Sequence, residues 1–380
     1  MSTTSAAPAG TWSDWKGRGR EMQYTIGIEE EAMLLEPESW RLAHRSDRVL
    51  EVLPPEVVMH ATTETHRSAL ELATGVHEGV GSAAAEMLSL RRALDAAVRA
   101  IGLRAASAGT HPSAVWQDTV VSDGKRYRFV YGSMRELARR EPTFALHVHV
   151  GISSANDAIR LVNRMRAHVP LLLALSVNSP FWQGRDTGLA SARTPLFQAF
   201  PRVGIPRRFR DYDDYVGTVD LLMRCESMPD PTFLWWDVRP QPRFGTVEVR
   251  IMDAQTTVAE TASIAALVQC IARLEVEQGY ASARALEVPE ALDENRFLAA
   301  RDGMGAELID VELERRVPAR ELALRLVDAC APHAHELGCE RELDGVVAMA
   351  ERTGADRQLD GARGPERLHG LVEALADQSV

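Results

Sequence analysis

The chain has 380 residues, of which 45% are hydrophobic and 26% are charged, and its formal net charge is −11. This composition is that of a globular protein with enough apolar residues for one large domain or two ordinary ones. The negative charge disfavours nucleic acid as a partner. The most apolar run, Val169 to Val177, is far shorter than the roughly 20 residues that cross a bilayer. We therefore expect a cytoplasmic protein that binds neither nucleic acid nor membrane.

Residues 1–20 are rich in Ser, Thr, Gly and Ala and lack the apolar stretch of a secretory signal. We predict a flexible N-terminal tail over 1–20, followed by a single domain over 21–380. The cysteines are widely spaced and form no CxxC pair, as is typical of reduced thiols in a cytosol. They are Cys225, Cys270, Cys330 and Cys339.

The first predicted strand, Tyr24 to Leu35, alternates between two faces. One face carries Glu29 and Glu31, and the other carries apolar residues such as Ile28 and Leu34. Two further acids, Glu64 and Glu71, follow in ETHRSALELATG. They would point in opposite directions in one regular strand, so both can be ligands only if a turn or bulge separates them. The alternative is that both are surface acids.

From Met87 to Ile101 the apolar residues recur at helical spacing, which predicts an amphipathic helix. The second predicted strand is Phe144 to Ile152, with His147 and His149 on its polar face. A helical pattern follows to about Val177.

The segment from there to Phe209 is rich in Pro and Gly and is basic within an acidic protein. It contains one acid, Asp186, and the arginines Arg185, Arg193, Arg202, Arg207 and Arg208.

The third predicted strand, Thr246 to Met252, places Glu248 and Arg250 on its polar face. The residues before it, WWDVRPQPRFG, include Arg239 and Arg243, and the chain after Thr257 has helical patterns. Strands without regular alternation with helices favour an α+β fold. We predict an antiparallel sheet with helices on one face and a polar opposite face.

Acids that gather on one sheet face repel one another unless cations neutralise them, so the acid cluster predicts bound metal. Oxygen ligands with an imidazole favour Mg²⁺, or Mn²⁺, over zinc, and Mg²⁺ in such sites usually accompanies nucleotide phosphates. We therefore expect ATP. The chain contains no GxxxxGK[ST] motif, so phosphate binding would depend on metal and arginines.

The sequence resembles the YbdK-type carboxylate–amine ligases of the glutamate–cysteine ligase type 2 family over nearly its whole length. The resemblance is carried by TIGIEEE, ELATG, AGTHP, LHVHVG, NSPFW, TGLASARTPLFQAFPR, WWDVRPQPRFGTVEVRIMDAQ, ENRFLAARDGMGAELID and LGCERELDGV. It implies a curved antiparallel sheet like that of the catalytic domain of glutamine synthetase, with metal and nucleotide on the concave face.

The resemblance also implies roles for individual residues. The metal ligands would be Glu29, Glu31, Glu64, Glu71, His147 and Glu248. The catalytic arginines would be Arg239, Arg243 and Arg250, and His149 and Arg193 would bind the nucleotide. The expected reaction is ATP-dependent amide formation through an acyl phosphate, with glutamate as the expected carboxylate and cysteine or another amine as acceptor. We also expect a homo-oligomer.

Two other functions are compatible with this pattern. A metal-dependent hydrolase can also use His-x-His on a strand, although it would need further histidines, and His111 and His168 do not complete such a set. A non-catalytic nucleotide-binding regulator could use the same fold, but every acid that the resemblance requires is present.

Overall fold

The computed structural model describes residues 11–17, 19, 23–140, 142–362 and 368–380. The helices are α1 (Ser46–Val52), α2 (Pro55–Val58), α3 (Val80–Ala100), α4 (Lys125–Met134), α5 (Ala155–Met165), α6 (Val169–Ser176), α7 (Arg193–Phe197), α8 (Tyr212–Arg224), α9 (Val258–Glu277), α10 (Ala283–Glu287), α11 (Pro289–Asp302), α12 (Ala319–Leu337), α13 (Glu340–Glu351), α14 (Gly354–Gly361) and α15 (Leu368–Gln378). The strands are β1 (Ile26–Leu35), β2 (Ala61–Thr63), β3 (Ala69–Ala73), β4 (Arg104–Ala106), β5 (Leu146–Gly151), β6 (Phe181–Trp182), β7 (Arg185–Asp186), β8 (Val203–Gly204), β9 (Trp235–Trp236), β10 (Val238–Gln241), β11 (Thr246–Val249), β12 (Glu307–Asp310) and β13 (Arg315–Pro318).

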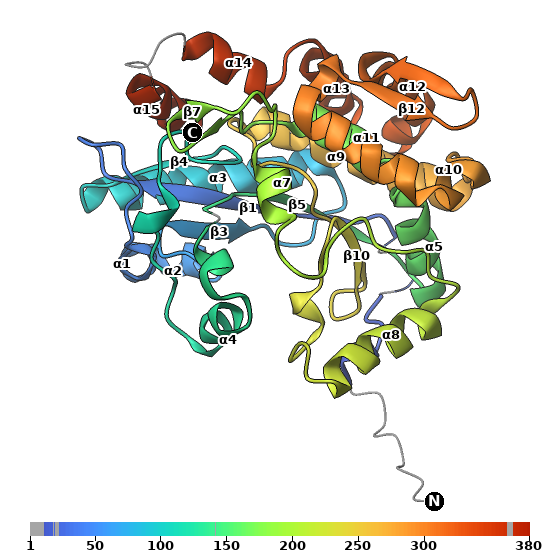
Figure 1. Cartoon of the computed structure of the whole chain (residues 1–380), viewed down its shortest axis with the longest axis horizontal. Helices are drawn as coiled ribbons and strands as arrows, with labels where there is room; N and C mark the ends of the chain where they lie inside the picture. The colour runs from blue at the N-terminus through green and yellow to red at the C-terminus, as the bar shows by residue number, and fades with distance from the viewer. Residues whose placement is uncertain (1–10, 18, 20–22, 141, 363–367) are drawn as a thin grey trace, which may run out of the picture.

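A seven-stranded sheet forms the centre of the molecule (Figure 1). Its order is β10-β11-β5-β1-β3-β2, with β4 pairing with the second half of β1, and all neighbouring strands are antiparallel. The predicted α+β class with a large antiparallel sheet is confirmed. The long helices α3 and α9 pack on one face, where they bury the apolar side chains of β1 and β5.

The predicted strands Tyr24–Leu35 and Phe144–Ile152 are one or two residues shorter at their ends, as β1 and β5, and two other elements differ more. The helix predicted from Met87 is α3, which begins at Val80. The strand predicted to reach Met252 ends as β11 at Val249. Beyond it, the Arg193 guanidinium donates to the carbonyl oxygens of Arg250 and Ile251, at 3.2 and 2.9 Å. Regular strand pairing ends here because the Arg193 side chain occupies these two carbonyl oxygens.

One acid of the first strand faces the helices. Glu30 is 2% exposed and accepts hydrogen bonds from Arg91 Nε and Nη2 of α3, at 2.8 and 2.9 Å. The remaining Arg91 donors reach the carbonyls of Gln255, Thr256 and Ser379. This buried ion pair therefore joins β1, α3, the segment before α9 and the C-terminus.

The segment predicted as a flexible tail contains a packed stretch, residues 11–17. Trp15 Nε1 donates to the carbonyl of Ile152 at 2.9 Å, and the amide of Lys16 donates to the carbonyl of Pro242 at 2.9 Å. Trp12 Nε1 donates to Asp220 at 3.0 Å. Residues 1–10, 18 and 20 lie outside the described part. The two tryptophans give this stretch the apolar surface that a flexible tail lacks.

The arginines of the basic segment do not gather into one patch. Arg193 is buried beneath β11, Arg207 pairs with Asp214 of α8, and Arg208 lies 3.4 Å from Glu287. Arg202 donates to the carbonyl of Phe233, and Arg185 is exposed in β7. Within the described ranges, none of the helices has the length and apolar character needed to cross a bilayer.

Candidate active site

Cross-strand pairing places the predicted polar residues in one row on the sheet face away from α3 and α9. Glu71 of β3 lies opposite Glu31 of β1, and Glu29 of β1 lies opposite His147 of β5. His149 lies opposite Glu248 of β11, which in turn lies opposite Arg239 of β10. Glu64 joins the row from the connection between β2 and β3, so a turn does separate Glu64 from Glu71. Residues spread over more than 200 positions therefore share one surface.

This row forms the wall of a cavity of about 370 Å³. The cavity is lined by all six predicted metal ligands and three of the predicted arginines: Glu29, Glu31, Glu64, Glu71, His147, Glu248, Arg193, Arg239 and Arg250. Three groups on this face of the sheet have ligand atoms close enough to share an ion: Glu31–Glu64–Glu71, Glu29–Glu71–His147 and Glu29–His149–Glu248.

The group nearest β3 consists of three clustered acids, Glu31, Glu64 and Glu71, and the pKa of each is raised. Burial, together with the neighbouring Glu64 carboxylate, raises the pKa of Glu31 to about 8. Burial and nearby acids also raise the pKa of Glu71 well above its usual value, and burial raises the pKa of Glu64. A bound cation would lower these pKa values and so would be stabilised by the three acids.

At the other end of the row, basic side chains compensate the acids. Burial would raise the pKa of Glu248, but Arg239 and Arg250 lower it well below the usual value. Arg239 binds this carboxylate through Nε and Nη2 at 2.7 and 3.1 Å, and Arg250 Nη1 also contacts it. Burial is likewise overcome at Glu29, whose pKa is lowered by His149 and His147.

The two histidines of β5 have pKa values that are shifted in opposite directions. Burial and the positive charge of Arg250 lower the pKa of His147 to about 4, so its imidazole is neutral at pH 7. Burial acts in the same direction on His149, but the carboxylates of Glu29 and Glu248 raise the pKa of that ring. A neutral imidazole beside carboxylates is a ready metal ligand.

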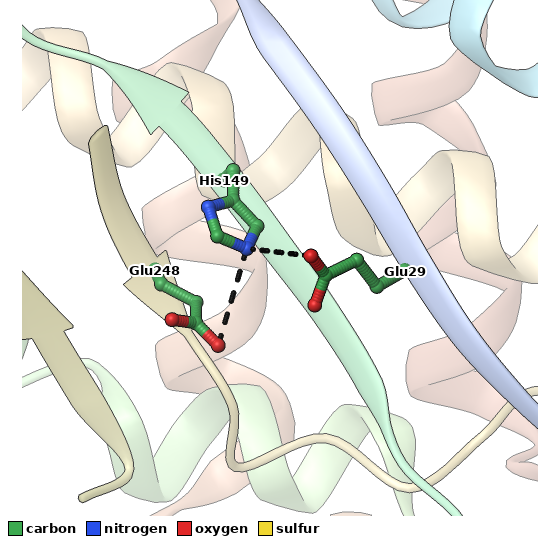
Figure 2. A group of neighbouring side chains, drawn as sticks. All are labelled: Glu29, His149 and Glu248. Carbon is green, nitrogen blue, oxygen red and sulfur yellow. Dashed lines mark ion pairs between the residues drawn. The ribbon is translucent and has the colours of Figure 1, made fainter. Parts of the chain in front are cut away.

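The surroundings of His149 provide a test of whether the residues fit a metal ion. Its Nε2 lies 3.3 Å from Glu29 and 3.9 Å from Glu248, yet this buried atom has no hydrogen-bond partner among the described residues (Figure 2). Its Nδ1 is 2.9 Å from Thr246 Oγ1, which fixes the ring. One imidazole nitrogen and two carboxylates that face one another form a donor set for a cation. Because most of these donors are oxygen atoms, the set suits Mg²⁺ or Mn²⁺. The residues therefore fit the metal.

The predicted arginines have distinct positions. Arg239 and Arg250 share Glu248, and Arg239 Nη1 also donates to the carbonyl of Leu234 at 2.5 Å. Arg193 supports the backbone after β11 and lies 3.6 Å from Asp253. Arg243 is exposed in the β10–β11 turn and does not line the main cavity.

A second cavity of about 320 Å³ lies beside the first, and Glu29 lines both. It is bordered by the ends of β1, β3 and β5 and by the β10–β11 turn, and its lining includes His149, Arg243, Phe244 and Lys16. The two nucleotide- and phosphate-binding predictions that fall outside the first cavity, His149 and Arg243, are thus brought together here.

Residue patterns did not identify the wall opposite the acids. It is formed in part by Arg126 and Tyr127 of α4 and by the aromatic residues Phe197, Phe200 and Trp235. The segment KRYRFVYGSM offers one usable signal, a concentration of cations and aromatics, but such a pattern is equally typical of an exposed helix.

Comparison with known proteins places this site in a family. The family model "Glutamate-cysteine ligase family 2(GCS2)" matches residues 25–375. A relative from Rubrobacter xylanophilus, named "Putative glutamate--cysteine ligase 2-1", is 40% identical over 328 residues, which are 86% of this chain and 87% of the relative. A relative from Sorangium cellulosum with the name "Putative glutamate--cysteine ligase 2" is 38% identical over 365 residues, 94% of this chain and 96% of its own.

Solved structures show the same fold at low identity. A glutamate–cysteine ligase from Francisella tularensis in complex with AMP has a TM-score of 0.69 at 14% identity, covering 95% of this chain and 90% of that one. A bifunctional glutathione synthetase from Pasteurella multocida has a TM-score of 0.68 at 12% identity, covering 94% of this chain and 53% of that one. The resemblance drawn from the motifs is confirmed, and the chain belongs to glutamate–cysteine ligase family 2, with the activity class of an ATP-dependent carboxylate–amine ligase.

Proposed function

We propose that the chain forms an amide from a carboxylate, with glutamate as the expected substrate, and an amine such as cysteine, through an acyl phosphate made from ATP. The observation that carries this proposal is the convergence of six metal-ligand side chains with Arg193, Arg239 and Arg250 on the wall of one cavity. Acids alone could hold a structural ion. Metal ions held by these acids, together with the arginines, would complement the negative charge of a transferring phosphoryl group.

The metal ligands proposed are Glu31, Glu64 and Glu71 at one end of the row, and Glu29, His147 and Glu248 with His149 at the other. Magnesium or manganese held there would neutralise phosphate oxygens and orient them for in-line transfer. The chain's own contribution is to fix the ligands on a rigid sheet whose opposite face is the hydrophobic core.

The second cavity suits the base of the nucleotide. Val76 and Phe244 line it with large exposed apolar surface, 68% and 54%, and Gly27 and Gly75 contribute no side chain. A flat aromatic ligand would cover this apolar surface. Its phosphates would then extend past Glu29 and His149 toward the first cavity, with Arg243 and Lys16 at the rim.

In the proposed reaction, a carboxylate oxygen of the first substrate attacks the γ-phosphorus and the bond to the ADP oxygen breaks. The neutral amine then attacks the acyl carbon, the carbon–oxygen bond to phosphate breaks, and the proton that the nitrogen loses leaves with the inorganic phosphate. Arg239 and Arg250 remain paired with Glu248 and supply positive charge beside the transferring group. The aromatic wall with Phe197, Phe200 and Trp235 limits access of water, which would otherwise hydrolyse the acyl phosphate.

The test is product identity. Purified protein with ATP, Mg²⁺, glutamate and cysteine should release ADP and phosphate in equal amounts with the amide, and omission of either the carboxylate or the amine should stop amide formation. AMP and pyrophosphate would show an adenylate route instead and would contradict the acyl phosphate. A panel of other carboxylates and amines extends the same assay.

The hydrolase alternative finds little support in the geometry. His111 donates to the carbonyl of Trp40, and His168 is paired with Glu275 on the helical side of the molecule. Neither histidine lines the main cavity. The regulator alternative would be favoured if the assay gave nucleotide binding without turnover.

A further inference from the structure

Arg126, the second residue of α4, lines the 370 Å³ cavity and differs from the other three arginines there in its ion pairing. Arg193, Arg239 and Arg250 each lie within 4 Å of a carboxylate of the protein. Arg126 lines the same cavity, but no Asp or Glu in the described ranges lies within ion-pairing distance of it. Arg126 Nη1 donates a hydrogen bond to Thr232 Oγ1 at 2.6 Å, and the guanidinium stacks over Phe233 with its carbon 4.4 Å from the ring centre.

These two contacts orient the guanidinium and leave most of its donors available. An arginine has five N–H donors in a planar fork, and a carboxylate accepts two of them side by side. Arg126 lines the same cavity as Glu31, Glu64 and Glu71. A carboxylate bound by Arg126 would therefore lie within the cavity and close to the reacting groups.

The neighbouring wall adds an apolar requirement. Val130 and Met134 follow Arg126 along α4 and line the cavity, as do Phe197 and Phe200. A ligand that satisfies this wall carries a short apolar chain beside its carboxylate. Amino acids such as glutamate and cysteine have both features, whereas an amine without a carboxylate has only the chain.

We propose that Arg126 binds a substrate carboxylate that takes no part in the reaction, and so selects amino acids over their decarboxylated analogues. This inference rests on the proposed function and names the chemical class of its substrates. The carboxylate has two possible sources: the α-carboxylate of glutamate, which leaves the side-chain carboxylate to react, or the carboxylate of an amino acid that acts as the amine. The same guanidinium chemistry serves both.

Binding measurements distinguish the sources and do not depend on turnover. Calorimetry in the presence of Mg²⁺ and ADP would compare glutamate with 4-aminobutyrate, and cysteine with cysteamine, on the whole chain. The wild type should bind the carboxylate-bearing member of one pair more tightly, by about 10-fold, as a charge-assisted hydrogen bond at an exposed arginine provides. Arg126→Met should remove that preference and leave affinity for the decarboxylated member unchanged.

The matched control is Arg128→Met, the same change on the same helix at an exposed arginine that lines neither cavity. It should keep the wild-type preference, and Arg126→Lys should keep part of it because the charge remains without the fork. The proposal is overturned if Arg126→Met weakens both members of each pair equally, if it changes neither, or if the wild type shows no preference within either pair. Absence of amide formation alongside an Arg126-dependent preference would instead contradict the proposed reaction and leave this inference standing.

Discussion

The Glu248 carboxylate contacts two kinds of cationic partner. Arg239 and Arg250 bind it directly, and His149 Nε2 lies 3.9 Å away as part of the proposed metal group (Figure 2). A metal ion bound to Glu248 would share the carboxylate with the two arginines. We therefore expect this residue to influence both the metal affinity and the position of the arginines.

Substitutions on this strand should separate the two roles. Glu248→Gln keeps the size of the side chain and removes the charge. Turnover should fall by about 100-fold or more, which corresponds to a loss of ~3 kcal/mol of electrostatic stabilisation. Raised Mg²⁺ should restore part of it. Arg250→Lys keeps the charge and loses the fork, so turnover should fall without rescue by Mg²⁺. Initial rates across a Mg²⁺ titration measure both effects. Rescue of Arg250→Lys but not of Glu248→Gln would contradict the assignment of metal binding to Glu248.

His111, in the motif AGTHP, is a structural residue with a predictable pH effect. Its Nε2 donates to the carbonyl of Trp40 at 2.7 Å, and its Nδ1 accepts from the amides of Ser113 and Ala114. Burial lowers its pKa to about 4 from the usual 6.5. The unfolded chain therefore binds the proton first, and the stability due to this histidine, present above pH 6.5, is lost as the pH falls toward 4.

The expected loss is up to about 3 kcal/mol, from a shift of some two to three pH units. His111→Gln, which cannot titrate, should be less stable at pH 7 but should lose less stability than the wild type between pH 6.5 and 4.5. Urea unfolding at both pH values measures the difference. Parallel pH dependence in the two proteins would contradict the assignment.

At the scale of elements, the alternating patterns of β1, β5 and β11 were sufficient to predict the sheet and its polar face. Alternation reports which residues share a face, and the antiparallel register then brings Glu29, His147 and Glu248 together. The prediction of Glu64 and Glu71 as metal ligands came from the family resemblance, because the turn between them breaks the alternating pattern. Alternation places Glu30 on the apolar face with Ile28, but it could not predict the buried partner, Arg91, which is 61 residues away in sequence.

The position of α4 was also unpredictable from its own residues. Arg126 lies on the cavity because its helix packs near Thr232 and Phe233, more than 100 residues later. The sequence of a basic, aromatic helix does not indicate which surface of the protein it will pack against. The same holds for Arg243, whose place at the second cavity depends on the β10–β11 turn.

The Glu30–Arg91 pair should matter for folding rather than for chemistry. Arg91→Met leaves Glu30 as a buried, unpaired carboxylate, and such a change costs about 3–5 kcal/mol. Urea unfolding should show this loss. The double substitution Glu30→Met with Arg91→Met should recover much of it, because no charge then remains buried. A double variant that is less stable than Arg91→Met would show that the backbone carbonyls bound by Arg91 contribute most of the stabilisation.

For the molecule as a whole, the proposed ligands and the core lie on opposite faces of one sheet. Removal of metal with EDTA should therefore abolish ATP binding while the chain stays folded, with melting lowered only by the binding energy of the lost ion. Circular dichroism and calorimetry with ATP, before and after Mg²⁺ is returned, measure the two effects. Unfolding on chelation at 25 °C would show that the metal is structural. The predicted homo-oligomer stays a prediction.

The packed stretch of residues 11–17 has a consequence for where this protein begins as a functional unit. The family match starts at residue 25, but Lys16 lines the second cavity, and the Gly17 backbone lies against Gly245, a turn glycine at φ +67° where a Cβ would collide with it. A shortened protein cut at the family boundary would keep the whole sheet and still lose part of the proposed nucleotide pocket. The proposed pocket therefore extends N-terminal of the family match, to Lys16, along a stretch that lies over the β10–β11 turn.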